Sequence, residues 1–432
     1  DRRASLNLHF TNVEPALFSD LSNRLIPLKT LDMPISGTLE ISFPIDGEVD
    51  EIRADISGKG GKLILLEPHR QELDVVSTKL KAKFHSGAGI ELEHFDVVFA
   101  EQTKIILSSP VSHTEPIRRL SLSGQFSDNG RVIELIKMTA DLNGPILNLS
   151  AKLSNSDDKS GSNRYRVQGE LDRLATGSFR QHWPERITPL PRKWIVEHIS
   201  GGFVEDLRFE ADVQSSIGGE IELLSITGGM KIRDIIVNYL PPGMPSVKHV
   251  SANVKFDEKT FSIDVETGRS QQLELVGGRV LITGLDQIDQ FADIDLKIKG
   301  GVRDQLVYIN HKPFRFASEL GLDVEQMEGD ADTHLKLFFI LERELSFKQI
   351  KVWARADLAG VRLGNIIQGH GIDNGNLNLR LDTLGVDVKG DVEIAKIPAK
   401  ITWRRNFAKH ANFISKYRLN GEIQDVQRLR DM

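Results

Sequence analysis

The chain consists mainly of short stretches in which apolar and polar residues alternate, and these stretches recur roughly every 8 to 14 residues. Residues two apart in an extended chain point to the same side, so each stretch buries one face only. Glycine, asparagine, aspartate and proline separate the stretches. The pattern predicts a mainly β chain of roughly 25 strands, joined by tight turns into an antiparallel meander.

The composition is that of a folded chain, with 40% hydrophobic and 27% charged residues of both signs interspersed. The net charge of −6 and the lack of a large basic block argue against a nucleic-acid partner, because phosphate binding needs a concentrated cationic surface. No cysteine is present, which excludes disulfides and thiolate chemistry. No run of 18 apolar residues occurs, so no membrane-spanning helix is expected within the sequence.

Three segments depart from the alternation and are predicted to be helical inserts, at about 14–31, 176–200 and 302–320. The first carries apolar residues three and four apart, which forms one amphipathic stripe: Leu17, Phe18, Leu21, Leu25 and Leu28. The third is predicted to be two short helices, because Pro313 would break a continuous one.

The second insert is the most unusual segment, because it holds two of the four tryptophans beside several prolines. Pro191 suits the first turn of a helix and Gly201-Gly202 suits its C-terminal stop, which predicts one short helix. A helix set into a sheet can plug or brace it. We expect four side chains to anchor it against the apolar floor of the sheet: Trp183, Trp194, Ile195 and Ile199.

Internal similarity indicates quasi-repeats at roughly 32–150, 200–300 and 345–423, each with the same order of glycines and strands. Residues 1–432 are therefore predicted to be a segment of one continuous, repeating β-structure.

So many half-apolar strands cannot be covered by three short helices. We therefore expect a long, twisted antiparallel sheet that curls into an open apolar groove. The alternative is a dry core beneath another layer. The residues predicted to line the groove are the alternate, apolar residues of the central strands, which point to one side of the sheet: Val254, Phe256, Ile263, Val265, Leu273, Leu275, Val280, Ile282, Leu377, Leu379, Leu381, Val386, Val388, Val392 and Ile394.

No motif for metal binding, cofactor binding or catalysis is found. The twelve histidines are scattered without a metal-ligand spacing. The glycine clusters at 58–62 and 369–375 lack the spacing of phosphate-binding loops and are predicted to be turns. No nucleophile elbow occurs, and the carboxylates are spread over the polar faces of strands. We expect no enzymatic activity and no cofactor.

Several stretches, taken in order from about residue 13 to residue 421, resemble the central part of large AsmA-like proteins of Gram-negative bacteria, of the YhdP type. They are Met33–Gly37, His182–Pro184, Arg192–Ile195, Gly201–Gly202, Val237–Pro241, Leu320–Asp330 and Pro398–Phe407.

The resemblance implies a repeating β-groove of the bridge-like lipid transfer type, which carries phospholipid between the inner and the outer membrane. It implies a periplasmic location, an inner-membrane anchor outside this chain, and an outer-membrane or periplasmic partner. It supplies no catalytic residues.

Two other readings remain open from the sequence. The first is a β-rich periplasmic or surface scaffold that carries no lipid, whose apolar face is covered by itself or by a partner chain. The second is an enzyme built on tandem β-sandwiches. Co-purifying phospholipid would favour the groove over both.

Overall fold

The computed structural model describes most of the chain, and the statements below concern that part. The described residues are 3–19, 28–45, 49–65, 70–87, 89–107, 112–127, 132–157, 162–215, 221–239, 243–311, 317, 324–341, 349–367, 370–407 and 413–422.

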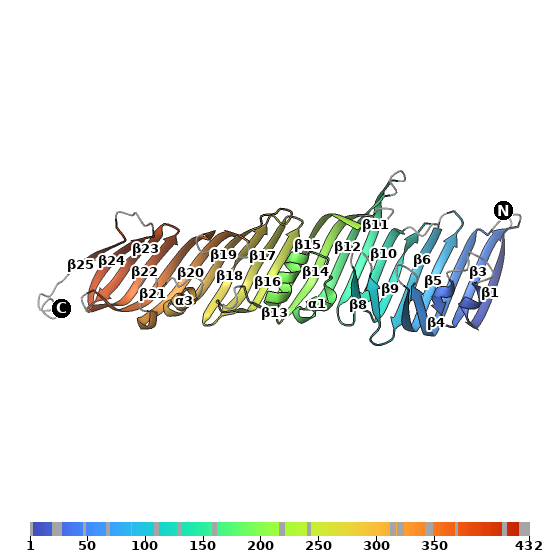
Figure 1. Ribbon diagram of the computed structural model, residues 1–432, viewed down its shortest axis with the longest axis horizontal. Helices are drawn as coiled ribbons and strands as arrows, with labels where there is room; N and C mark the ends of the chain where they lie inside the picture. The colour runs from blue at the N-terminus through green and yellow to red at the C-terminus, as the bar shows by residue number, and fades with distance from the viewer. Residues whose placement is uncertain are drawn as a thin grey trace. The chain divides into compact units, whose positions relative to one another are not determined.

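The described chain is mainly β, as predicted. Twenty-three strands form one antiparallel sheet, which does not close into a barrel, and two further strands form a separate hairpin (Figure 1). Three short α-helices complete the described part. The chain divides into two compact units, Asp1–Glu197 with Val204–Met230 and His198–Phe203 with Lys231–Met432. The three quasi-repeats expected from the sequence remain a prediction.

In the first unit the strands pair almost entirely in chain order, so that each strand lies beside the next. The strands are β1 (Arg3–Val13), β2 (Leu31–Asp32), β3 (Ile35–Pro44), β4 (Glu51–Leu65), β5 (Gln71–His85), β6 (Gly89–Phe99), β9 (Arg119–Phe126), β10 (Val132–Asp141), β11 (Ile146–Asp157), β12 (Ser162–Ala175) and β14 (Phe203–Ser215), with the separate hairpin β7 (Lys104–Leu107) and β8 (His113–Pro116). Strand β15 (Ile221–Val237) contributes residues to both units.

The core of the first unit lies where this hairpin packs on the sheet. Val97 on β6 and Val75 on β5 are buried there, together with Ile117, which follows β8. Each side chain buried in this way contributes about 1.5–3 kcal/mol. The hairpin therefore covers part of one face of the sheet.

The second unit holds the short strand β13 and an uninterrupted meander. Its elements are β13 (Ile199–Ser200), β16 (Val247–Asp257), β17 (Thr260–Ser270), β18 (Leu273–Thr283), β19 (Phe291–Gly301), α3 (Val302–Ile309), the 3-10 helix η4 (Val324–Gln326), β20 (Met327–Ile340), β21 (Lys351–Ile367), β22 (His370–Asp382), β23 (Gly385–Ile394), β24 (Ile397–Asn406) and β25 (Ser415–Gly421). Each strand from β16 to β25 pairs with its successor where the register is described.

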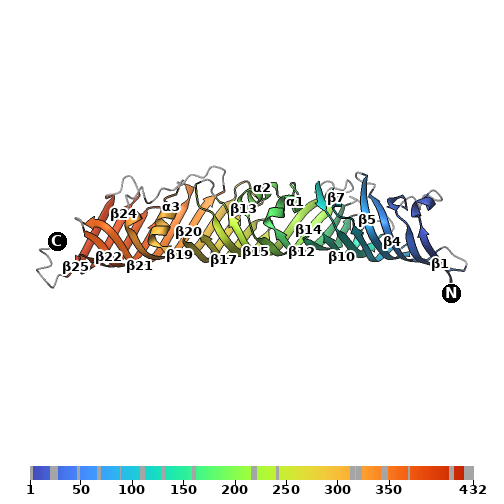
Figure 2. The ribbon, with the colours of Figure 1, turned by 90° about the horizontal axis from the view of Figure 1, so that it is seen from below.

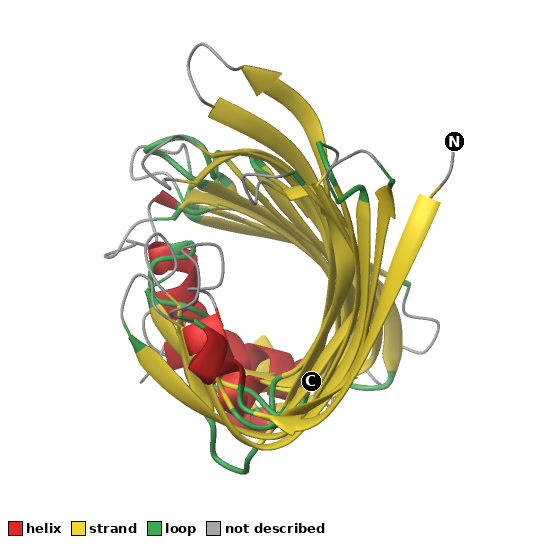
Figure 3. Cartoon of the chain, turned by 90° about the vertical axis from the view of Figure 1, so that its right-hand side faces the viewer, coloured by secondary structure: helices red, strands yellow, loops and turns green. Residues whose placement is uncertain are grey.

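The strands are bent, and the helices lie toward the inside of the curve (Figure 3). β-Bulges contribute to such bending and also change which residues share a face. In β18 the register shifts between Leu275 and Gly277, so that Gly278, three residues after Leu275, lies on the same face of the sheet as Leu275. A Cβ at Gly278 would lie 2.2 Å from the carbonyl oxygen of Asp295, so only glycine fits there.

The two glycine clusters are not the turns that the sequence predicted. Residues 58–62 lie inside β4, where Gly60 and Gly61 have φ of 66° and 134°. Residues 370–375 lie in β22, with Asn374 at a φ of 48°, and residues 368–369 lie outside the described part. Left-handed residues within a strand bend the strand and do not end it, because the partner strands continue on both sides.

The predicted helical inserts are only partly confirmed. The first contains the 3-10 helix η1 (Pro15–Phe18), in which Leu17 and Phe18 of the predicted apolar stripe are 72% and 43% exposed. Leu28 of that stripe is half-buried, and Leu21 and Leu25 lie outside the described residues. The second is broken into η3 (Thr176–Ser178), α1 (Phe179–His182) and α2 (Pro189–His198). The third begins with α3, and most of the second helix predicted there lies outside the described residues.

α2 is the short helix predicted with Pro191 in its first turn, but the insert as a whole is not one helix, because Trp183 precedes a proline. The ring of Pro184 disfavours helical backbone at the residue before it. Trp183 accordingly adopts an extended conformation, with φ −109° and ψ 106°, and ends α1. The expected C-terminal glycines serve a different purpose. Gly201 and Gly202, with φ of 66° and 61°, form the tight turn between β13 and β14.

Candidate functional site

The strand register places all fifteen predicted lining residues on one face of the second unit, here called the apolar face. Residues opposite one another in neighbouring strands share a face. One row of such partners runs Val265, Gly278, Leu296, Leu335, Ala354, Leu381 and Val386. A second row runs Ile298, Thr333, Ala356, Leu379, Val388, Trp403 and Tyr417.

None of the fifteen is exposed. Seven are buried, namely Val254, Leu273, Leu377, Val386, Val388, Val392 and Ile394, and the other eight are half-buried. Neighbouring side chains on this face shield one another. Their role as a groove lining therefore stays a prediction.

The opposite face, here called the charged face, carries ion pairs between neighbouring strands. Arg279 on β18 lies 3.1 Å from Asp264 on β17. Asp295 on β19 binds Lys336 at 2.7 Å and His334 at 2.5 Å, both on β20. The hydrogen bond from Lys336, with a smaller contribution from His334, lowers the pKa of Asp295. Charge is thus concentrated on one side of the sheet and apolar surface on the other.

The first unit has the same division between its faces. A row of partners runs Leu80, Phe95, Leu122, Met138, Leu149 and Gly169 across β5 to β12. On the other side, Lys83 binds Glu93 at 2.5 Å and Arg119 binds Asp96 at 2.7 Å. Each unit therefore presents an apolar face of its own.

Helix α3 packs against the apolar face of the second unit. Val302 and Leu306 join the apolar cluster that contains Leu377 and Val388. Gln305 is hydrogen-bonded at both ends of its amide: Nε2 donates to the carbonyl oxygen of Ala331 at 3.0 Å, and Oε1 accepts from the Thr333 hydroxyl at 2.6 Å. Because Thr333 belongs to the second row described above, α3 is held directly over that face.

A second connection to α3 comes from the end of β15. The hydroxyls of Tyr239 and Tyr308 are hydrogen-bonded to each other. Burial, with a further contribution from Tyr308, raises the pKa of Tyr239 well above its ordinary range. Tyr239 is therefore neutral at physiological pH and acts as a structural hydrogen-bonding group.

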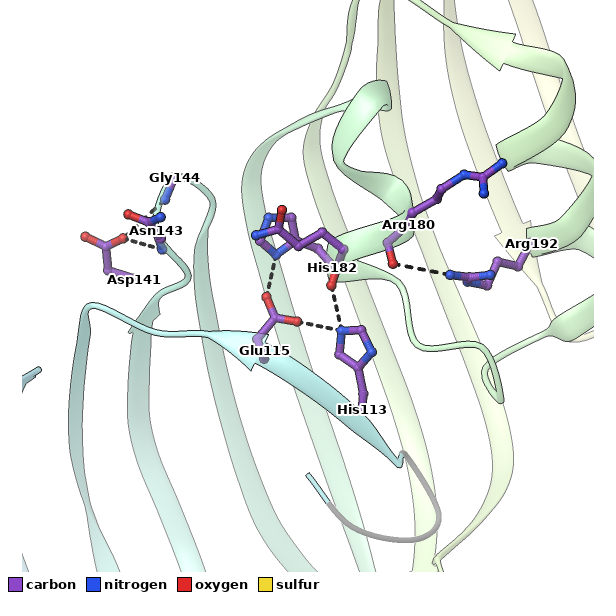
Figure 4. Close-up of polar contacts among 9 residues, drawn as sticks. His113, Glu115, Asp141, Asn143, Gly144, Arg180, His182 and Arg192 are labelled. Atoms are coloured by element: carbon purple, nitrogen blue, oxygen red, sulfur yellow. Dashed lines mark hydrogen bonds and ion pairs between the residues drawn. The ribbon is translucent and has the colours of Figure 1, made fainter. Parts of the chain in front are cut away.

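In the first unit a buried carboxylate links the β7–β8 hairpin to helix α1 (Figure 4). Glu115 on β8 is hydrogen-bonded to His113 Nε2 at 2.9 Å through Oε2 and to His182 Nδ1 through Oε1. His113 Nε2 also lies 2.6 Å from the carbonyl oxygen of Gln181. Both acceptors require a proton on that nitrogen, so His113 donates there. This Glu115–histidine clasp holds the hairpin beside the helix on one side of the sheet (Figure 2).

The predicted tryptophan anchors do not behave alike. Trp183 is half-buried and packs edge-on against Phe179 at 6.1 Å, and its Nε1 donates to the carbonyl oxygen of Ile187 at 3.0 Å. Trp194 is 43% exposed, which does not fit the role of a buried anchor, while Ile195 and Ile199 are half-buried. The buried aromatic residue of this insert is Phe179, which the sequence reasoning missed.

Sequence reasoning also missed the Glu115–histidine clasp and the Gln305 contacts. The clasp joins residues 67 positions apart, so no local spacing identifies it. In the described part of the chain, no group of three or more His, Asp or Glu could hold a metal ion. No helix there is long and apolar enough to cross a membrane.

The comparisons with known proteins identify no relative. No protein-family model, no curated protein sequence and no solved structure matches the chain. The resemblance to AsmA-like proteins therefore remains a prediction from the sequence.

Proposed function

We propose that the protein binds phospholipid acyl chains on its apolar faces and conducts them across its successive strands. The observation that carries the proposal is the apolar face of the second unit, which extends over ten strands, β16 to β25, whereas α3 has eight residues. Two rows of partners on that face consist almost wholly of aliphatic, aromatic and small side chains. An acyl chain would replace water over the part that protein does not cover.

The energetics favour passage over tight binding. Each buried CH₂ group contributes about 0.8 kcal/mol, so a continuous apolar surface offsets the removal of an acyl chain from a bilayer. Movement then requires similar binding free energy at successive positions, which repeated Val, Ile and Leu side chains provide. No selective pocket is needed for the acyl chains, and charged headgroups would stay in water at the strand ends.

In the cell, this activity would carry phospholipid between the inner and the outer membrane across the periplasm and contribute to outer-membrane lipid homeostasis. The AsmA-like resemblance supports this placement. It also supports an inner-membrane anchor outside this chain and an outer-membrane or periplasmic partner. The proposal includes no enzymatic activity, no cofactor and no nucleic-acid partner.

Native mass spectrometry of the purified chain tests the proposal. We expect phospholipid adducts that survive gentle ionisation, and phospholipid in an organic extract of the same sample. A preparation that stays lipid-free after incubation with phosphatidylethanolamine and phosphatidylglycerol vesicles would contradict the proposal.

A pair of substitutions on β17 separates a lipid-binding face from a dry core. Val265 lies opposite Gly278 on the apolar face, and Ser262 lies opposite Lys255 on the charged face. Val265→Asp should reduce bound lipid while circular dichroism still shows a folded sheet, and Ser262→Asp should leave lipid binding unchanged. Loss of the fold in Val265→Asp alone would instead favour a dry core.

A scaffold without lipid is the second candidate, and one observation favours it. In the described part of the first unit, β1 pairs only with β3, and its apolar residues Leu6 and Leu8 are 47% and 42% exposed. An unpaired strand edge of this kind can accept a strand from a partner chain. A lipid-free protein that forms defined assemblies would support this alternative.

A further inference from the structure

Apolar side chains project from successive connections at one edge of the second unit. Neighbouring strands of a meander run in opposite directions, so the connections β18–β19, β20–β21, β22–β23 and β24–β25 all lie at the same edge of the sheet, opposite α3 (Figure 1). One aliphatic side chain protrudes at each of them: Ile288 is 100% exposed, Leu341 43%, Leu384 65% and Ile414 70%. These four residues are here called the aliphatic rim.

The aliphatic rim is a row and not a scatter of single residues. The N–H of Leu341 donates to the carbonyl oxygen of Gln290 at 2.8 Å, and the N–H of Phe407 donates to that of Leu384 at 2.9 Å, so neighbouring strand ends are bonded side by side. Connections two strands apart are separated by about 10 Å. Single exposed apolar residues are ordinary on a protein surface, but four in one row indicate an interaction surface.

The opposite edge of the same sheet differs. Among the described residues there, the tight turns are Gln271–Gln272 and Ala395–Lys396, whose side chains are polar or small. Val276 and Ile309 are exposed near that edge, at 42% and 36%, but they lie within β18 and α3 and not in a turn. The row of protruding aliphatic side chains is therefore a property of one edge.

Aromatic side chains lie directly behind the aliphatic rim on the charged face. The rings of Phe291 and Phe338 are stacked with their centroids 5.8 Å apart, and Lys351 Nζ lies 5.5 Å from the centroid of Phe338. Trp353, the third residue of β21, stands opposite Lys336 on that face and is 44% exposed. Tryptophan and lysine have apolar bodies and polar ends, which suits the layer of a bilayer in which acyl chains meet headgroups.

The order inward from the edge, aliphatic and then aromatic with lysine, matches the change of polarity from the acyl chains of a bilayer to its headgroups. We propose that the aliphatic rim inserts into the surface of a phospholipid bilayer, with Phe338 and Trp353 at the level of the headgroups. A fluid bilayer accepts separate protruding side chains at any spacing, whereas a protein partner needs a matching pocket for each. This inference goes beyond the proposed function, because a bilayer can hold the rim whether or not acyl chains lie on the apolar face.

Carboxylates in the same connections set the depth of insertion and the lipid preference. Asp286 and Asp289 flank Ile288, and Asp382 Oδ1 accepts hydrogen bonds from the N–H groups of Leu384 at 2.8 Å and Gly385 at 3.1 Å. Carboxylates are costly in hydrocarbon, so only the tips of the rim pass below the headgroups. Negative charge at the rim also means that anionic lipid should not strengthen the binding.

The test uses single cysteines in the full chain, which has none of its own. Ile288→Cys and Leu384→Cys are labelled with the polarity-sensitive dye nitrobenzoxadiazole and mixed with dioleoylphosphatidylcholine vesicles. Val276→Cys is the matched control, because it replaces an exposed aliphatic residue of β18 near the opposite edge. We expect the emission of both rim labels to rise and shift to shorter wavelength, and that of the Val276 label to stay unchanged.

Vesicle cosedimentation of unlabelled variants gives the magnitude. Combining Ile288→Ser with Leu384→Ser should weaken partition into the vesicles about hundredfold, since each inserted aliphatic side chain contributes roughly a factor of ten. Val276→Ser should leave partition unchanged. All three positions are exposed, so circular dichroism should show the same folded sheet in every variant.

Three results would overturn the inference. The first is rim labels that do not respond to vesicles, or that respond no more than the Val276 label. The second is a response that appears without vesicles as the protein concentration rises, which would assign the rim to a contact between copies of the chain. The third is binding that requires dioleoylphosphatidylglycerol and is lost at high salt, which would indicate adsorption by charge and not insertion.

The outcomes also separate this inference from the proposed function. Silent rim labels in a protein that still shows phospholipid adducts in native mass spectrometry overturn the docking of the rim alone. A clear vesicle response in a protein without adducts overturns acyl-chain binding on the apolar face and leaves the docking of the rim standing.

Discussion

Val388 and Lys389 are adjacent in β23 and test the assignment of the two faces. Val388 is 8% exposed and lies between Leu379 and Trp403 in the second row of the apolar face. Lys389 is exposed on the charged face, opposite Asn378 and Thr402. Replacing either by aspartate introduces a carboxylate at almost the same point of the chain, but in opposite surroundings.

The expected loss for Val388→Asp follows from its burial. Removing a buried valine side chain costs about 2 kcal/mol. Placing a carboxyl there without a hydrogen-bond partner costs about 1–3 kcal/mol more, so the total is about 3–5 kcal/mol near neutral pH. Lys389→Asp should stay within about 0.5 kcal/mol, as is usual for exposed positions.

The pH dependence of this loss has a definite sign. Burial raises the pKa of an introduced carboxyl above its unfolded value, so the folded state binds the proton more tightly. Stability then rises as the pH falls, and the penalty of Val388→Asp should shrink in acid. If the loss of stability in Val388→Asp did not change with pH, its cause would be steric and not the burial of a charge.

Hydrogen exchange under native conditions is the suitable assay, because two compact units need not unfold together. The amides of Gly385–Ile394 should exchange much faster in Val388→Asp than in Lys389→Asp. Equal exchange in the two variants would show that the strand does not have one apolar and one charged face, and the groove proposal would lose its basis.

Three further outcomes are expected. Gln305→Ala removes both hydrogen bonds from the Gln305 amide to β20 and should lower the protection of α3 from exchange by about 1–2 kcal/mol. Arg303→Ala, at the exposed pair with Glu325, should have little effect. Equal effects of the two substitutions would refute the role of Gln305 in holding α3. Glu115→Gln should weaken the Glu115–histidine clasp by about 1.5–3 kcal/mol and expose both β8 and α1 to proteolysis. Cleavage at only one of these two elements would contradict the role of the clasp in joining them. The lowered pKa of Asp295 stabilises the fold above the ordinary carboxyl pKa of 3.8, and this contribution is lost as the pH falls through the lower folded value. Asp295→Asn should therefore slightly reduce the loss of thermal stability between neutral and acid pH, and the effect is small because the site is partly exposed. A larger loss in the variant than in the unsubstituted protein would contradict the prediction.

Much of the β architecture was predictable because its signal is local. Alternation with a period of two assigns each residue of a strand to a face without knowledge of its partners. For this reason the fifteen predicted residues from Val254 to Ile394 all fall on one face.

The errors arose where a local pattern has two physical meanings. Glycine clusters signal either a turn or a bend within a strand, and only the continuing partner strand beside Gly60 and Gly61 shows the bend. Tryptophan beside proline signals an anchor or a helix end. Pro184 ended α1 at Trp183, as its ring requires, while Trp194 remained largely exposed.

The amino-acid pattern alone therefore determined the strand class, the direction of pairing between neighbours and the division of each strand into an apolar and a polar side. These depend on backbone geometry over two to ten residues, which the order of side chains specifies directly. Tertiary structure alone decided which distant groups meet, as with Glu115 and His182 or Gln305 and Thr333. Such contacts depend on the accumulated register and on bulges, and a shift of one residue would reverse the face of every side chain that follows.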